Sequence, residues 1–176
     1  VRASAGLDRT LAVFIKIASA ESGSYTVNQD GASASFVTQI STYTGVDTTT
    51  PQDASASSSA SESISSPTAP QITTQTDRAF VETVIYARGL SLGVPNMPTG
   101  YTNFGQELQA NAYTGAAYRD IIGPTVEQPG TWNSFSASSD VLMITWAMRP
   151  ASSAGGVTDL FQGPNLGKDL FDGTII

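Results

Sequence analysis

The chain of 176 residues contains no cysteine and no histidine, and only 13% of its residues are charged, against the usual ~25%. These absences exclude disulfides and the Ser-His-Asp and Cys-His arrangements, and they exclude a zinc site for practical purposes. The net charge is -7 and the eight basic residues stand singly, so neither nucleic acid nor an anionic membrane is an expected partner.

Residues 10–18 place apolar side chains at every second position from Leu11 to Ile17, which predicts a strand with one buried face. After a turn, a short strand is predicted over residues 24–27. The β-branched and aromatic residues of the segment 33–44 predict the next strand. The beginning of the chain is therefore expected to be β-structure.

Residues 48–70 are dense in Ser, Ala, Thr and Pro. Such a composition is typical of a flexible linker between two domains. We favour a long surface connection with a small edge strand inside it, because strand patterns resume directly afterwards and neither flank can bury a core alone. Long connections without any structure are also uncommon in compact domains.

Six more strands are predicted before residue 150. They cover residues 71–75, 78–87, 101–109, 111–122, 131–137 and 140–149. Residues 78–87 and 140–149 are largely apolar on both faces, which is typical of central strands. About nine strands without a helical period indicate an all-β fold, an antiparallel jelly-roll-like β-sandwich over residues 1–150.

The core of this sandwich should come from the apolar faces of the predicted strands. The residues expected in it are Leu11, Val13, Ile15, Ile17, Phe36, Ile40, Val81, Val84, Ile85, Leu142, Ile144 and Trp146.

Residues 151–176 follow Pro150 with a flexible Ser-Ser-Ala-Gly-Gly segment and are expected to form an extended tail. Isolated apolar pairs in a Gly- and Asp-rich segment cannot form a core of their own. The tail is therefore predicted to be an assembly arm on another subunit, and the alternative is a tail folded back on its own domain. The residues expected to make the contact are Leu160, Phe161, Leu170, Phe171, Ile175 and Ile176.

No catalytic residue, metal or cofactor is expected. A glycosidase would need two paired carboxylates, whereas the acids here stand singly. Glu82 alone lies inside a strongly apolar strand, which would raise its pKa, but we favour a solvent-facing side chain beside Arg78 or Arg88. Asp47 and Asp53 flank a loop with oxygen ligands for calcium; because they lack the spacing of a calcium loop, they are expected to cap turns.

Four aromatic side chains suggest a different function. Aromatic faces on a β-sandwich are a common platform for sugars, although large aromatics are more often buried in the core. The residues that could stack on a glycan are Tyr101, Tyr113, Tyr118 and Trp132.

The run Tyr-Thr-Gly-Val-Asp-Thr-Thr-Thr-Pro-Gln-Asp at residues 43–53 is the most specific signal in the sequence. It resembles the Y-S/T-G-V-D-T-T-x-P-x-D segment of a family of jelly-roll-like β-sandwich repeats. Other segments are similar to that family in the same order, namely LAVFIKIA at 11–18, APQITT at 69–74 and a closing strand that ends in MRPA at 148–151. The resemblance covers residues 1–151.

This family is found in bacteriophage structural proteins and in large bacterial surface proteins. The resemblance implies a structural protein of the virion, such as a capsid decoration, neck, fibre or tail component, which binds other virion subunits as a homo-oligomer. The alternative is an extracellular carbohydrate-binding or adhesive module that meets a host surface glycan. Family domains usually begin with one more turn and strand, so the chain is expected either to be a piece of a longer protein or to receive that strand from another chain.

Overall fold

The computed structural model describes residues 2–3, 10–20, 24–26, 38–89, 93–109, 112–133, 135 and 139–152. All regular structure in these residues is β, which confirms the predicted all-β antiparallel fold. They contain no helix that could cross a membrane. The strands are β1 (Arg2–Ala3), β2 (Leu11–Ala12), β3 (Gln52–Ile64), β4 (Ile72–Thr73), β5 (Ala79–Arg88), β6 (Thr102–Gln109), β7 (Ala112–Ile121), β8 (Val126–Glu127) and β9 (Ser139–Met148).

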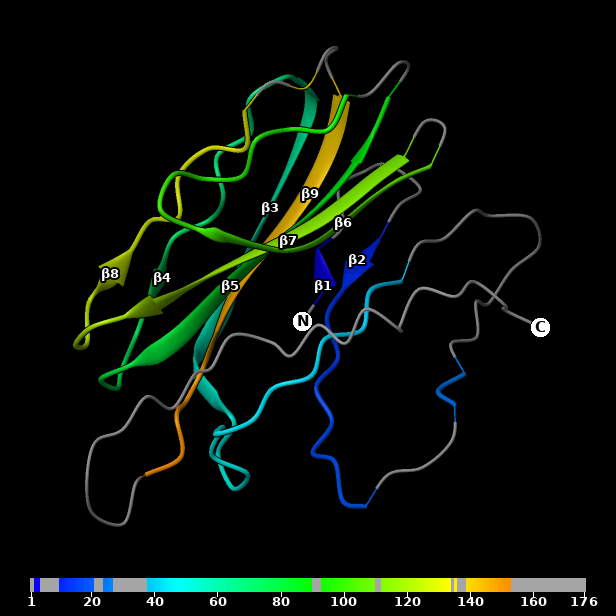
Figure 1. Ribbon diagram of the computed structural model, residues 1–176. Helices are drawn as coiled ribbons and strands as arrows, with labels where there is room; N and C mark the ends of the chain where they lie inside the picture. The colour runs from blue at the N-terminus through cyan, green and yellow to red at the C-terminus, as the bar shows by residue number, and fades with distance from the viewer. Residues whose placement is uncertain are drawn as a thin grey trace.

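Five strands form one twisted antiparallel sheet in the order β3-β9-β5-β7-β6 (Figure 1). Strands β5 and β9 pair continuously from Phe80 opposite Met148 to Arg88 opposite Asp140. Both are largely apolar on their two faces, so they are most stable where neighbouring strands and covering segments exclude water on every side. The prediction that these two segments are central strands is confirmed.

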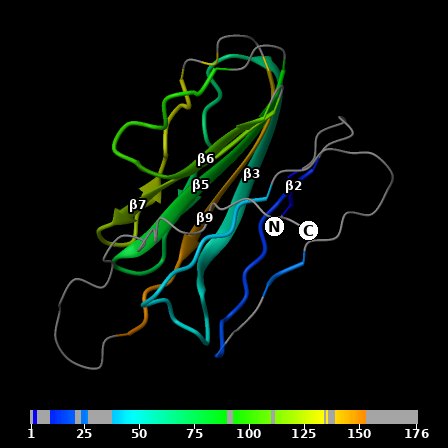
Figure 2. The same cartoon turned by 45° about the vertical axis from the view of Figure 1, so that its right-hand side comes forward.

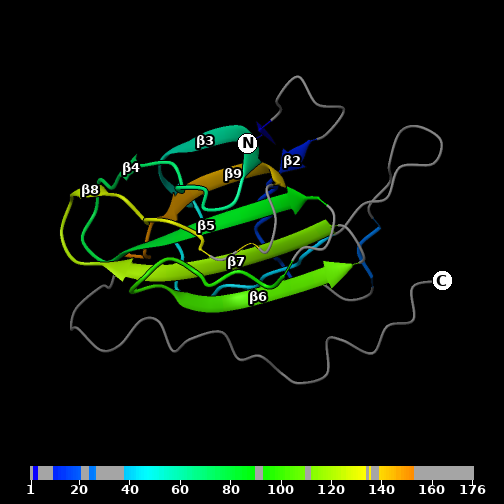
Figure 3. The ribbon, with the colours of Figure 1, turned by 90° about the horizontal axis from the view of Figure 1, so that it is seen from above.

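One face of the sheet, the ribbon face, packs against a second layer made of the two-stranded β4–β8 ribbon and the loops around it (Figures 1 and 3). Ile72 on β4 and Trp132 in a loop share one buried cluster with Val81 and Met143 of the sheet. Single β-bridges between the loops hold this layer together. The two packed layers make the fold sandwich-like.

The opposite face, the motif face, is covered by β2 and the segment that follows it, together with residues 38–47, drawn blue and cyan in Figures 1 and 2. Ile144 on β9 packs against Leu11 and Val13. Trp146, also on β9, packs in a neighbouring cluster that includes Tyr43. This cover places the motif that carries the family resemblance directly on the central sheet.

Strand β3 is the largest departure from the sequence prediction. Thirteen residues of the segment expected to be a surface connection form the longest strand in the described part of the chain, paired with β9 at the edge of the sheet. The edge strand predicted inside this connection is present, but it is much longer than the small strand expected, and the linker alternative is wrong for these residues. Ser and Ala have little preference for strands, but β9 offers a row of backbone hydrogen-bond partners, and this tertiary context overrides the local preference.

The strands predicted after residue 100 agree better with the structure. The strands predicted at residues 101–109 and 111–122 are confirmed as β6 and β7. The strand predicted at residues 131–137 is wrong for the described residues, which contain only isolated bridges at Thr131 and Asn133. These two residues bridge to two different segments, so no continuous ladder forms.

The N-terminal segments contain less sheet than predicted. Of residues 10–18 only Leu11–Ala12 is a strand, and it pairs with β1. Residues 24–26 and 38–44 are not strands, and the preceding residues 33–37 lie outside the described part.

The predicted core is therefore correct in the sheet and wrong in the N-terminal segments. Val81, Ile85, Leu142, Ile144 and Trp146 are buried, and Leu11, Val13 and Val84 pack beside them partly buried. Ile15, Ile17 and Ile40 are exposed, because the strands expected to bury them end early or do not form, and Phe36 lies outside the described residues.

Candidate functional site

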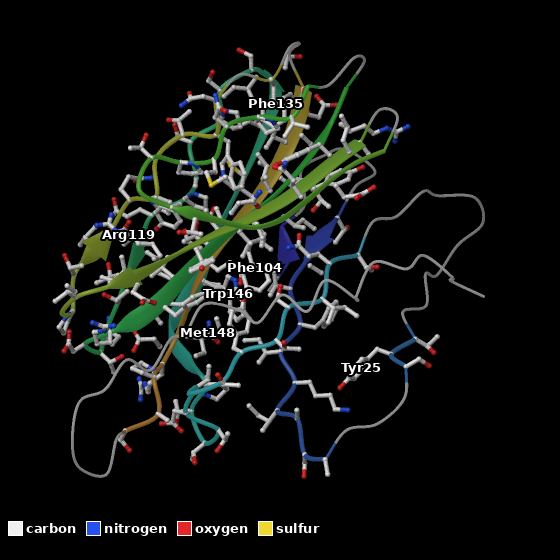
Figure 4. All side chains as sticks on the ribbon, viewed as in Figure 1. Tyr25, Phe104, Arg119, Phe135, Trp146 and Met148 are labelled. Carbon is white, nitrogen blue, oxygen red and sulfur yellow. The ribbon has the colours of Figure 1, made fainter. Side chains whose placement is uncertain are left out.

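Tyr43, the first residue of the motif, packs into a group of aromatic rings on the motif face. Its ring centroid lies 5.1 Å from that of Phe80, 5.4 Å from Phe104 and 6.2 Å from Trp146. Phe80 in turn stacks on Tyr118 at 4.9 Å. Phe104 and Trp146, both labelled in Figure 4, come from β6 and β9, and each contacts the ring of Tyr43. We refer to these five residues as the aromatic cluster.

Glu82 shares this face of the sheet with the aromatic cluster. It lies opposite Tyr118 on β7 and opposite Trp146 on β9, and only 3% of its surface is exposed. The hydroxyl of Tyr43 donates a hydrogen bond to its carboxylate. A carboxyl group on the middle strand is thereby joined to the segment that covers the sheet.

The prediction that Glu82 faces solvent beside Arg78 or Arg88 is wrong, because residues 38–47 cover this part of the sheet. Burial raises the pKa of the Glu82 carboxyl to about 7, although the hydrogen bond from Tyr43 acts in the opposite direction. The indole N–H of Trp146 also lowers the pKa, without meeting the geometry of a hydrogen bond. Burial likewise raises the pKa of the Tyr43 hydroxyl, which keeps it a donor.

A buried carboxyl that titrates near neutrality is a common property of catalytic acids. Among the described residues, the groups that shift the pKa of Glu82 include no second carboxylate and no basic side chain. No three acidic residues gather into a metal-binding group within the described ranges. The geometry fits an anchor for Tyr43 better than it fits an acid–base pair.

Asp47 caps the turn that follows it, as predicted. Its Oδ1 accepts hydrogen bonds from the backbone N–H groups of Thr50, at 3.1 Å, and Thr49, at 2.8 Å, and these bonds lower the pKa of its carboxyl. Its own N–H donates to the carbonyl of Arg149 at 2.9 Å. The first half of the motif is thus fastened to the end of β9.

Asp53, at the end of the motif, caps a turn that lies far along the chain rather than its own. Its buried carboxylate accepts the N–H of Gln75 and the hydroxyl of Thr76, both at 2.6 Å. The guanidinium of Arg149 lies 3.6 Å away. These contacts fasten the start of β3 to the turn before β5, so both acids of the motif have structural roles.

The glycan-stacking prediction does not hold for the four aromatic residues proposed. Tyr101, Tyr113 and Trp132 are buried, and Tyr118 is half-buried within the aromatic cluster. Tyr101 points its hydroxyl at Glu127, to which it donates a hydrogen bond of 2.9 Å. Tyr101, Tyr113 and Trp132 therefore have no open face for a sugar, and one face of the Tyr118 ring is covered by Phe80.

A polar groove of about 620 Å³ lies between the beginning of β3 and β4. Ser55, Ser57, Gln71 and Gln75 contribute to its walls, and none of the described residues that line it is aromatic. Asp53 in the same wall is already bonded to Gln75. The groove offers hydroxyl and amide groups but lacks the stacking surface that sugar binding usually uses.

An exposed apolar segment is the feature that sequence reasoning missed. Phe14 is 90% exposed, Ile15 45% and Ile17 41%. The alternation over residues 10–18 predicted a buried face here, whereas the side chains on both faces of this stretch contact water. The residues proposed for the assembly tail, namely Leu160, Phe161, Leu170, Phe171, Ile175 and Ile176, lie outside the described residues.

Comparison with known proteins finds no match to the chain among family models, curated proteins or solved structures. The resemblance of residues 43–53 to the sandwich repeat family therefore stays a prediction, while the roles of Tyr43, Asp47 and Asp53 rest on the contacts described above.

Proposed function

We propose that this chain is a structural subunit of a bacteriophage particle, such as a capsid decoration, neck, fibre or tail component, and that it works by binding neighbouring subunits. Such a protein needs surfaces for its neighbours rather than a catalytic centre. The exposed apolar segment of residues 14–17 is the observation that carries the assembly role. The family resemblance of the motif supports the assignment to a phage particle.

The apolar segment is unusual for a chain that remains alone in water. Three large apolar side chains within four residues are exposed there, and Ile40 is 63% exposed as well. Single exposed apolar residues are common on protein surfaces, whereas a contiguous group marks a site of interaction. Because the sheet is already covered on both faces, we infer that these side chains serve a contact with another molecule.

Changing Phe14, Ile15 and Ile17 together to Ser tests this role. We expect the variant to remain folded, with a melting temperature close to that of the unchanged chain, because the removed groups contact mainly water. We expect the assembled fraction to fall at least tenfold in sedimentation velocity or light scattering at equal concentration.

The matched control is Ile122→Ser, which removes a side chain that is 80% exposed at the end of β7. This variant should assemble as the unchanged chain does. An unchanged assembly of the triple variant would exclude the apolar segment as the contact.

The tail of residues 151–176 is expected to contribute a second contact. The described part of the chain reaches Ser152, after the N–H of Ala151 donates to the carbonyl of Gly45 at 2.7 Å. We expect deletion of residues 152–176 to leave a folded monomer that no longer assembles, since all described strands of the sheet and its covers end before Ser152. A truncated chain that is unfolded by circular dichroism would show instead that the tail belongs to its own core.

A further inference from the structure

Strand β3 lies at one edge of the sheet. Its backbone pairs with β9 on one side, and no described residue forms a ladder with it on the other. Figure 3 shows β3 at the outer margin of the sheet. Ser55, Ser58, Ala60 and Glu62 are exposed along it. A row of unpaired N–H and C=O groups of this kind is a template for another strand.

This edge lacks most of the features that prevent strand addition. The strand contains no Lys, Arg or Pro, and six of its thirteen residues are Ser. Register shifts relative to β9 occur towards both ends, between Ala54 and Ser57 and between Ser61 and Ile64. The regular stretch from Ser57 to Ser61 lies between them. Pairing with a new strand should therefore centre on that stretch.

The opposite edge strand, β6, is shorter, with eight residues against the thirteen of β3. Its register shifts between Asn103 and Gly105, near its beginning. The side chain of Gln39 lies so close to Gly105 that an added Cβ there would be 2.6 Å from the amide nitrogen. Glu107 also places an exposed charge on this strand. Strand β3 is the longer edge strand, and its regular stretch from Ser57 to Ser61 contains no charged residue, so we consider it the better candidate for pairing.

We infer that the partner is a second copy of this chain, whose β3 pairs antiparallel with the first about a two-fold axis at Ser59. This pairing would place Ser58 opposite the partner's Ala60 and Glu62 opposite the partner's Ala56. No carboxylate then faces another, because the remaining acid of the strand, Asp53, is buried and bonded within its own subunit. The strand is thus complementary to itself, as a two-fold interface requires.

The small side chains of β3 determine how strong this contact is. Ser and Ala add little apolar area, so the backbone hydrogen bonds of the new ladder must supply most of the attraction. A single contact of this kind is weak, and it becomes effective where each subunit makes several contacts at once. The inference rests on the proposed assembly function and names the partner and the geometry of one contact.

The test replaces Ser58 and Ala60, which are both exposed, with Lys. In the inferred pairing four Lys side chains would meet, so the full chain carrying S58K/A60K should dissociate at a concentration at least tenfold higher than the unchanged chain in sedimentation equilibrium. S58E/A60E should behave in the same way. An equimolar mixture of the two variants should assemble again, because opposite charges now face each other.

The matched control is Q106K/L108K, which places two Lys residues at equivalent spacing on the exposed surface of β6 and should assemble normally. Because the chain has no cysteine, S58C and A60C chains mixed under oxidising conditions should also form a disulfide-linked dimer. This second measurement does not depend on the stability of the Lys variant.

Each result decides a separate question. If the unchanged chain assembles and S58K/A60K assembles equally well, the β3 contact is wrong while the assembly function stands. If assembly is lost but the charge mixture does not restore it and no S58C–A60C dimer forms, the edge binds a different strand rather than a second copy. If the unchanged chain is monomeric at every concentration, both the contact and the proposed function are wrong.

Discussion

Replacing Glu82 with Gln should raise the free energy of unfolding by about 3 kcal/mol at pH 8 and leave it nearly unchanged at pH 4. The folded chain raises the pKa of this carboxyl from 4.5 to about 7, because burial disfavours its charged form. The folded state therefore holds the proton more tightly than the unfolded state. The stability from the protonated carboxyl is fully present below pH 4.5 and is lost as the pH rises through 7.

Gln has the shape of the protonated carboxyl and can still accept the hydrogen bond of Tyr43, but it does not titrate. Urea unfolding of both chains from pH 4 to pH 8 measures the difference, in which the titration of the other acids cancels. Glu62→Gln, at an exposed position on β3, is the control and should follow the unchanged chain at every pH. Parallel stability curves for the Glu82→Gln and unchanged chains would mean that Glu82 is not buried as described.

Truncating Ile144 to Ala should cost roughly 2 to 5 kcal/mol of stability. Ile144 is fully buried on the motif face of β9, where it packs with Leu142 and lies under Leu11 and Val13. The loss combines the transfer free energy of the removed carbon atoms with the cost of the cavity that remains. Its size depends on how far Leu11 and Val13 can move into that cavity. Urea or thermal unfolding at constant pH gives the value.

Ile122→Ala is the matched control, because the same side chain is shortened where it is largely exposed. We expect less than about 0.5 kcal/mol for this change. A loss of similar size for Ile144→Ala would contradict the packing of residues 11–13 on the motif face.

The central strands could be predicted because their signal is local. Strands β5 and β9 are largely apolar on both faces, and this pattern alone indicates a position between other strands. Strand β3 carries no such signal, since its Ser and Ala residues match a linker as well as a strand. Its structure depends on the partner strand β9, which is more than seventy residues further along the chain. Residues 14–17 show the opposite error, because a strong local pattern predicted a strand, whereas no ladder with another described segment forms there.

In the candidate site, too, contacts between residues near in sequence could be predicted and contacts between distant residues could not. The turn cap of Asp47 could be predicted from residues two and three positions away. The partner of Glu82 could not, because Tyr43 lies 39 residues earlier in the chain. The aromatic residues proposed for sugars could not be told from core residues, since the same ring can serve either purpose and only its surroundings decide.

The mass of the full chain in solution tests the assembly function most directly. Sedimentation velocity across the micromolar range should give species whose masses are multiples of the 18.3 kDa subunit, with the larger species favoured at higher concentration. The contacts proposed for the exposed apolar segment and for the outer edge of β3 both predict this result. A single 18.3 kDa species at every concentration would contradict the account.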